Sequence, residues 1–123
     1  MIKLLIIEDQ PELLETLEIA LAGEYAVTGA LTAEAGLTCA LEIQPQVVLV
    51  DYALPAMNGL ELAANLRRLD QSANGGKGRV RPRIIMFSAQ MDEQLAAIAL
   101  QAGVDQCLAK PFDLNALKAA IGG

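Results

Sequence analysis

The chain has 123 residues, with 9 basic and 15 acidic side chains and a formal net charge of −6 at pH 7. This length fits one ordinary domain with a real core and is too short for two, and a composition of 54% hydrophobic and 20% charged residues is globular rather than disordered. The negative net charge argues against whole-surface binding to nucleic acid or to an anionic membrane, and the absence of histidine excludes Ser-His-Asp triads, Cys-His pairs and imidazole zinc sites.

The cysteine content and the first residues bear on the compartment of the protein. Two cysteines, Cys39 and Cys107, cannot build a disulfide framework and are typical of a reducing cytosol. The first apolar run, residues 4–7, is far shorter than the roughly 20 residues that a membrane-spanning helix needs, and no small-residue cleavage site follows it. We therefore expect a cytoplasmic protein without a membrane segment.

Short apolar runs alternate with amphipathic stretches along the chain. Branched apolar residues predict five buried strands, at residues 2–7, 25–30, 47–50, 84–87 and 106–109. Apolar spacing, caps and breakers predict a helix after each strand, at residues 11–22, 33–43, 59–69, 92–102 and 114–121. Strand–helix–strand connections require parallel pairing with right-handed crossovers. The sequence therefore predicts an α/β fold with a doubly wound, five-stranded parallel sheet and helices on both faces, since a closed eight-stranded barrel needs about twice as many residues.

One segment departs from this compact pattern. Residues 70–83 form a glycine-rich connection between the third helix and the fourth strand, and six of the nine basic residues lie in or beside it: Arg67, Arg68, Lys77, Arg79, Arg81 and Arg83. The simpler interpretation is a solvated loop in an acidic protein. The alternative is a docking patch for an acidic partner.

Polar side chains follow four of the predicted strands at the point where each strand ends. Glu8 and Asp9 follow the first strand, Asp51 the third, Ser88 the fourth and Lys110 the fifth. Because sites in open parallel sheets form at the carboxyl ends of the strands, we expect these residues to converge on one edge. Singly, each has an ordinary explanation, such as a helix cap, a polar loop residue or a solvated charge. Their joint occurrence indicates a site.

Three carboxylates brought together require positive charge. Two like charges about 4 Å apart repel by roughly 4 kcal/mol at an effective dielectric constant near 20. Oxygen ligands without histidine or cysteine favour Mg²⁺ or Mn²⁺ over zinc, and Mg²⁺ leaves coordination positions open for phosphate oxygens. With Lys110 as a second positive charge and Ser88 as a hydrogen-bond donor, the residues predict a phosphoryl site in which Asp51 is the nucleophile and forms an aspartyl phosphate.

Four stretches of the sequence together match a known family. They are residues 4–9 (LLIIED), 48–59 (VLVDYALPAMNG), 86–89 (MFSA) and 108–112 (LAKPF). In this order and spacing, the chain resembles the receiver domain of two-component response regulators, of the chemotaxis-regulator type, over essentially its whole length. The resemblance implies a flavodoxin-like fold with strand order 2-1-3-4-5, and a single receiver domain at residues 1–123 without an output domain.

The resemblance implies a role for each residue around the acceptor. Asp51 accepts a phosphoryl group from a partner histidine kinase or histidine phosphotransfer protein, which makes the chain a signalling module rather than an enzyme. Asp9 and Asp51 bind Mg²⁺ directly, Glu8 acts through water, and the carbonyl of Ala53 is a further ligand. Ala53 and Ala89 are assigned to cofactor binding.

The same resemblance describes the residues on the other side of the acceptor. Lys110 pairs with Asp51 or with its phosphate, and Ser88 donates a hydrogen bond to a phosphate oxygen. The Lys110–Pro111 peptide bond is expected to be cis, which costs little before proline. Gly59 is expected in the tight turn that follows the phosphorylation loop.

Cys107 departs from the family pattern. The family usually has an aromatic residue at this position, which swings inward after phosphorylation. In the family, the usual route from the phosphate to the face made by the fourth helix, fifth strand and fifth helix depends on that ring, which position 107 lacks here. The plain interpretation of Cys107 is a small buried hydrophobe, and the alternative is a redox-sensitive thiol. The basic connection at residues 70–83 is also longer than usual in the family.

Three other functions compete with this interpretation. A phosphatase of the haloacid dehalogenase type would need a second acid two residues after Asp51, where Ala53 stands. A flavin-binding protein of the same topology would need a phosphate-binding loop where Glu8 and Asp9 repel phosphate. A degenerate receiver, which binds partners without being phosphorylated, is the alternative hypothesis, and the complete set of site residues argues against it.

The sequence does not identify the kinase, the signal or the downstream partner. We expect no direct binding to nucleic acid and no membrane association. Homodimerisation linked to phosphorylation is common in the family, and the resemblance implies it for this chain.

Overall fold

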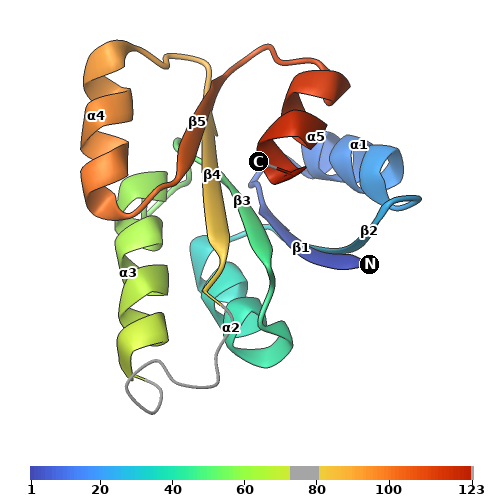
Figure 1. Ribbon diagram of the computed structural model, residues 1–123, viewed down its shortest axis with the longest axis horizontal. Coiled ribbons are helices and arrows are strands. Elements are labelled where there is room, and N and C mark those ends of the chain that lie inside the picture. The colour runs from blue at the N-terminus through green and yellow to red at the C-terminus, as the bar shows by residue number, and fades with distance from the viewer. Residues whose placement is uncertain (73–80, 123) are drawn as a thin grey trace.

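The computed structural model describes residues 1–72 and 81–122 as five strands and five helices in alternation (Figure 1). The strands are β1 (Ile2–Ile7), β2 (Tyr25–Ala30), β3 (Val47–Asp51), β4 (Arg83–Ser88) and β5 (Gln106–Ala109). The helices are α1 (Pro11–Leu21), α2 (Ala33–Ile43), α3 (Gly59–Ser72), α4 (Glu93–Ala102) and α5 (Leu114–Gly122). Over these described ranges, none of the helices combines the length and the apolar character that crossing a bilayer requires.

The five strands form one parallel sheet. Their order is β2-β1-β3-β4-β5, with β3 in the centre and β2 and β5 at the edges. The register places Val50 of β3 beside Ile7 of β1 and beside Met86 of β4, and Ser88 of β4 beside Ala109 of β5. The carboxyl ends of β1, β3, β4 and β5 therefore meet at one edge. The predicted fold class and strand order are confirmed.

Helices cover both faces of the sheet, and each face has its own apolar core (Figure 1). On one face, α1 and α5 pack on side chains that include Leu49 and Phe87. On the other face, α2, α3 and α4 pack on side chains that include Val50 and Met86. Because β3 and the interior of β4 are buried on both faces, these strands are almost continuously apolar, as their sequence predicts.

Most helix boundaries follow the predicted caps. The side chains of Thr32 and Asp92 accept backbone hydrogen bonds at the starts of α2 and α4, and Gly103 ends α4 in the left-handed conformation with φ 108°. The exception is α3, predicted to end at Leu69, which continues to Ser72. No glycine or proline interrupts the chain there.

The basic residues near the connection from α3 to β4 do not all belong to one surface patch. Lys77 and Arg79 lie outside the described residues, so their part in a docking patch stays a prediction. Arg67 and Arg83 instead make hydrogen bonds within the fold. Arg83 donates to the carbonyl of Ala120 at 2.8 Å and so ties β4 to α5.

Arg67 joins three segments at the amino ends of the strands. Its guanidinium donates to the carbonyl of Pro82 at 2.7 Å, to the carbonyl of Gly103 at 3.0 Å and to the carboxylate of Asp105 at 2.7 Å. The same oxygen of Asp105 accepts the amide hydrogen of Ile84 at 2.8 Å. Arg67, with its side chain 14% exposed, therefore fastens α3 to the start of β4 and to the turn between α4 and β5.

We predict that Arg67→Met lowers the free energy of unfolding by about 2–4 kcal/mol, because it removes the charged partner of the half-buried Asp105 carboxylate and the guanidinium donor of two carbonyls. Arg68→Met is the matched control, since Arg68 is exposed and bonds to Asn65 within α3. The control should change the same quantity by less than about 0.5 kcal/mol. Urea unfolding followed by circular dichroism measures both, and equal midpoints for the two variants would contradict the bridging role of Arg67.

Candidate functional site

Four adjacent strands carry the predicted site residues to one edge of the sheet. Glu8 and Asp9 directly follow β1, Asp51 and Ser88 are the last residues of β3 and β4, and Lys110 directly follows β5. The strand residues that directly precede Glu8, Asp51 and Ser88 in β1, β3 and β4 are fully or almost fully buried. The backbone of the site is therefore positioned by the rigid part of the fold.

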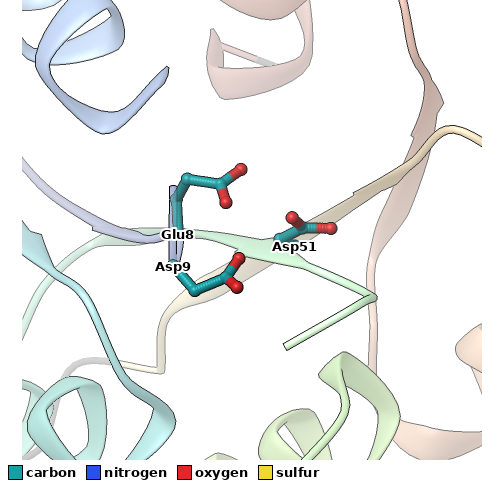
Figure 2. Close-up of side chains that lie close together, drawn as sticks. All are labelled: Glu8, Asp9 and Asp51. Carbon is teal, nitrogen blue, oxygen red and sulfur yellow. The ribbon is translucent and has the colours of Figure 1, made fainter. Parts of the chain in front are cut away.

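Three carboxylates form the centre of the site. One oxygen from each of Glu8, Asp9 and Asp51 lies within 4.8 Å of the others, and Figure 2 shows the three side chains around a common space. Glu8 is fully buried and Asp51 is 4% exposed, whereas Asp9 is half-buried. Two of the three acidic groups are thus almost cut off from water.

Lys110 brings positive charge to this cluster. Its ammonium nitrogen lies 3.3 Å from Oδ2 of Asp51 and 3.5 Å from Oε1 of Glu8. It also lies 5.0 Å from the centre of the Phe87 ring, within the range of a cation–π interaction. The peptide bond between Lys110 and Pro111 is cis, as predicted. The ammonium group is therefore placed between two carboxylates and an aromatic face.

Backbone amides orient the two neighbouring polar side chains. Oδ1 of Asp51 accepts the amide hydrogen of Ala53 at 3.1 Å, and Oγ of Ser88 accepts that of Gln90 at 3.1 Å. The amide of Lys110 donates to the carbonyl of Ser88 at 2.9 Å. Asp51 thus has one oxygen held by a backbone donor and the other by an ammonium.

Gly59 allows two backbone segments to approach closely beside the acceptor. It is the first residue of α3, and its amide donates to the carbonyl of Tyr52 at 2.9 Å. A Cβ at this position would lie 2.9 Å from the Cα of Tyr52 and 3.0 Å from the carbonyl oxygen of Asp51. The positive φ of this connection belongs instead to Ala56, at 67°. Glycine is therefore required here for space.

Burial raises the pKa of Glu8 from 4.5 to about 7. The amide of Gln10, which donates to Oε2 at 3.0 Å, opposes this rise in pKa, as does the charge of Lys110. Asp51 and Asp9 both favour the protonated form of Glu8. Oε1 of Glu8 is buried and accepts no hydrogen bond from the described residues. A proton or a cation is therefore favoured at this carboxylate.

The donor set is compatible with a hard divalent cation. The three carboxylates of Glu8, Asp9 and Asp51 offer only oxygen, the ligand atom preferred by Mg²⁺ and Mn²⁺. Oε1 of Glu8, which accepts no hydrogen bond from the described part of the chain, can be satisfied by such an ion or by a water that the ion holds. The residues present therefore fit Mg²⁺.

Phe87 has a second role that its sequence position alone does not indicate. Phe87 and Phe112 both pack in the core beneath α1 and α5, with ring centres 5.6 Å apart. In addition, the Phe87 ring faces the ammonium of Lys110. The position of Phe87 directly before Ser88 was the available sequence signal, but the contact with Lys110 depends on the pairing of β4 with β5.

Two further predicted positions lie at the margins of the site. Cys107 is half-buried, packs against the core of α2, α3 and α4, and has a thiol pKa raised by burial. A raised pKa favours the unreactive thiol, which agrees with the interpretation of Cys107 as a small hydrophobe. Ala89 is exposed and lines, together with Lys110, an apolar hollow of about 520 Å³ between α1 and α5.

We predict that the metal-free protein loses stability as the pH rises from about 4.5 to about 7, the window set by the pKa of Glu8. The folded chain binds this proton more tightly than the unfolded chain does, so deprotonation costs up to about 3 kcal/mol of folding free energy. Mg²⁺ should reduce this loss, because the cation replaces the proton. Melting temperatures at pH 5 and 7.5, in EDTA and in Mg²⁺, provide the measurement.

Glu8→Gln is the control for this pH prediction, because it removes the titrating group and keeps the size of the side chain. The variant in EDTA should be more stable than the parent protein at pH 7.5, and the difference should shrink at pH 5. A parent and a variant with the same pH profile would contradict the electrostatic description of Glu8.

Comparison with known sequences identifies one family over nearly the whole chain. The family model described as the response regulator receiver domain matches residues 4–122. The DNA-binding response regulator MtrA of Mycolicibacterium smegmatis is 32% identical over 120 residues, which are 97% of this chain and 48% of that protein. The transcriptional regulatory protein KdpE of Mycobacterium tuberculosis is 34% identical over 112 residues, 90% of this chain and 45% of that protein. The chain spans about half the length of these curated relatives.

Solved structures support the same fold. The receiver domain of the Francisella response regulator 1452 superposes with a TM-score of 0.86 and covers 99% of this chain and 94% of its own. Its sequence identity is 20%, so the likeness concerns the fold.

Proposed function

Because the chain belongs to the response regulator receiver domain family, we propose that it is a phosphoacceptor switch in which Asp51 accepts a phosphoryl group from a partner protein. The observation that carries this proposal is the Asp51 carboxylate, held between the other two acids and the ammonium of Lys110 at 3.3 Å. The chain has no histidine. A phosphohistidine donor therefore lies outside these 123 residues, and we propose a sensor histidine kinase or a histidine phosphotransfer protein as its source.

The proposed reaction is a phosphoryl transfer between two side chains. An oxygen of Asp51 forms a bond to phosphorus while the bond from phosphorus to the donor imidazole nitrogen breaks, and that nitrogen keeps the electron pair. Lys110 offsets the negative charge near Oδ2 of Asp51, and the amide of Ala53 fixes Oδ1. Positioning and neutralisation of charge are what this chain supplies.

Mg²⁺ is the proposed cofactor, with Mn²⁺ as a substitute. Glu8, Asp9 and Asp51 would hold it, with the carbonyl of Ala53 as a further ligand. When bound, the ion would neutralise charge on the phosphoryl oxygens.

Ser88 and Lys110 are proposed to bind the phosphoryl oxygens after transfer. Oγ of Ser88 accepts a hydrogen bond from Gln90, which leaves the hydroxyl hydrogen free to be donated. Lys110 already touches Asp51, so it can follow the new charge with little movement. Ala89 is exposed directly after Ser88 and, with Lys110, lines the apolar hollow between α1 and α5; its part in binding the phosphoryl group is proposed from its place in the chain.

The output of the switch is proposed to be a change in the surface that this chain presents to other proteins. MtrA, named as a DNA-binding response regulator, and KdpE, named as a transcriptional regulatory protein, match this chain over about half of their own length. We propose that this chain acts by binding proteins, since it carries a net charge of −6. A phosphorylation-linked homodimer is one form of this output. A cytoplasmic location is part of the proposal, because Cys39 and Cys107 are both free thiols.

We predict that acetyl phosphate with Mg²⁺ adds one phosphoryl group to the parent protein and none to Asp51→Asn, because the acceptor oxygen is lost. Intact-protein mass spectrometry provides the measurement. Asp113→Asn is the matched control, since this exposed aspartate caps α5 through Ala116 and asparagine can retain that bond. An unmodified parent that also ignores beryllofluoride would favour the degenerate receiver.

We predict that Lys110→Ala retains Mg²⁺ binding but loses most of the conformational response to beryllofluoride, a reduction of about fivefold or more. The carboxylates remain in place, whereas the charge that links Asp51 to β5 is removed. Backbone amide shifts in NMR spectra report the response. Lys118→Ala is the control, because Lys118 pairs with Glu24 at the surface. Equal responses in the Lys110→Ala variant and the parent protein would disprove this role.

A further inference from the structure

Tyr52 is fixed to the site through its backbone. It directly follows Asp51, and its amide donates to the carbonyl of Phe87 in β4 at 2.9 Å. Its own carbonyl accepts the amide hydrogen of Gly59 at 2.9 Å, and Gly59 has no room for a Cβ against the Cα of Tyr52. Any displacement of the Asp51 backbone is therefore passed on to Tyr52.

The side chain of Tyr52 faces the start of α4 across a small hollow. It is half-buried and packs against the core beneath α2, α3 and α4. The hollow has a volume of about 230 Å³, and the residues that line it with Tyr52 come from the loop after β4 and from α4: Gln90, Asp92, Gln94, Leu95 and Ile98. The ring therefore has space to move against the first turns of α4.

The opposite wall of this hollow is also connected to the site. The amide of Gln90 donates to Oγ of Ser88 at 3.1 Å, and Asp92 caps α4 by accepting the amide hydrogen of Leu95 at 2.7 Å. A movement of the Ser88 hydroxyl would displace the Gln90 backbone, which lies only two residues before the Asp92 cap of α4. Both walls of the hollow are tied to residues of the proposed phosphoryl site.

The two ends of α4 are held with different strength. Within this helix, Ala99 is the buried residue, and Asp92 and Gln94 at its start are exposed. At its far end, the Gly103 carbonyl accepts a hydrogen bond from Arg67 at 3.0 Å. Among the described residues, the start of α4 is held by its own cap at Asp92 and by the packing of Leu95 on the core. Because these hydrogen bonds are local, we take the start of α4 as the end that can move.

Tyr52 supplies the aromatic ring on this face of the sheet. The chain has two tyrosines, two phenylalanines and no tryptophan. Tyr25, Phe87 and Phe112 belong to the core beneath α1 and α5, whereas Tyr52 packs against the other core. On β5, Cys107 faces this second core with a small side chain.

We propose that Tyr52 is a positioning residue that couples the state of Asp51 to the start of α4. The proposal rests on the proposed function, because it concerns the response to a phosphoryl group at Asp51. When the charge at Asp51 changes, the Tyr52 ring and the Gln90 loop close on each other across the hollow, and the first turn of α4 shifts. The Arg67 bond to Gly103 fixes the other end of the helix.

Hydrogen exchange of the α4 amides, with and without beryllofluoride and Mg²⁺, tests this coupling. The amides of Leu95 and Ala96 are the reporters, because both bond to the Asp92 cap. We expect the parent protein and Tyr52→Phe to respond equally, and Tyr52→Leu to lose the response by about fivefold or more at equal fluoroberyllate occupancy. Tyr25→Leu removes a ring on the other face and should respond like the parent protein.

The outcomes separate this inference from the proposed function. Fluorine NMR of bound fluoroberyllate measures occupancy, and its absence in the parent protein would overturn both. A full response of α4 in Tyr52→Leu at equal occupancy would overturn the inference alone. Should Tyr52→Leu not fold, Tyr25→Phe leaves Tyr52 as the one tyrosine, and a ring NMR spectrum that does not change with fluoroberyllate would overturn the inference as well.

Discussion

The burial of negative charge at one edge of the sheet is the constraint on which the rest of the structure depends. Glu8 is fully buried beside Asp51, and one of its oxygens lacks a hydrogen bond within the described residues. Like charges at about 4 Å repel by roughly 4 kcal/mol at an effective dielectric constant near 20, and a small domain has only about 5–15 kcal/mol of net stability. One ammonium, that of Lys110, touches both acids. The site is therefore built to take up more positive charge.

The fold holds this cluster because the site residues are attached to its most deeply buried parts. Leu4 to Ile7, Val48 to Val50 and Ile84 to Phe87 have no exposed surface, so the backbones that carry Glu8 and Asp51 cannot separate without moving the centre of the sheet. At the other end of the strands, Arg67 joins α3 to β4 and to the turn before β5. The stability needed to keep like charges together thus comes from the apolar layers and from a network distant from the site.

Much of this arrangement could be predicted from local sequence, and the rest depends on contacts between distant segments. The apolar run before Asp51 predicts a buried strand, and parallel pairing then predicts that Asp51 lies near Glu8 and Lys110. No local pattern shows that Arg67 serves the fold whereas Arg68 faces solvent, because the partners of Arg67 lie 15 to 38 residues away. The contact of Phe87 with Lys110 likewise depends on β4 pairing with β5. The φ of 67° at Ala56 has no signal in its residue type.

The two sides of the site differ in rigidity, and this difference decides where a charge added at Asp51 can be accommodated. The side of the site formed by β1 and β3 is rigid, because its strands are buried on both faces. The loop after β4 and the start of α4 are mostly exposed, and their hydrogen bonds to Ser88 and Asp92 are local ones. Moving the buried strands would disrupt both apolar cores, whereas moving the loop exchanges a few bonds that water can replace. A response to charge at Asp51 therefore travels toward α4, and Tyr52 lies between the acceptor and that helix.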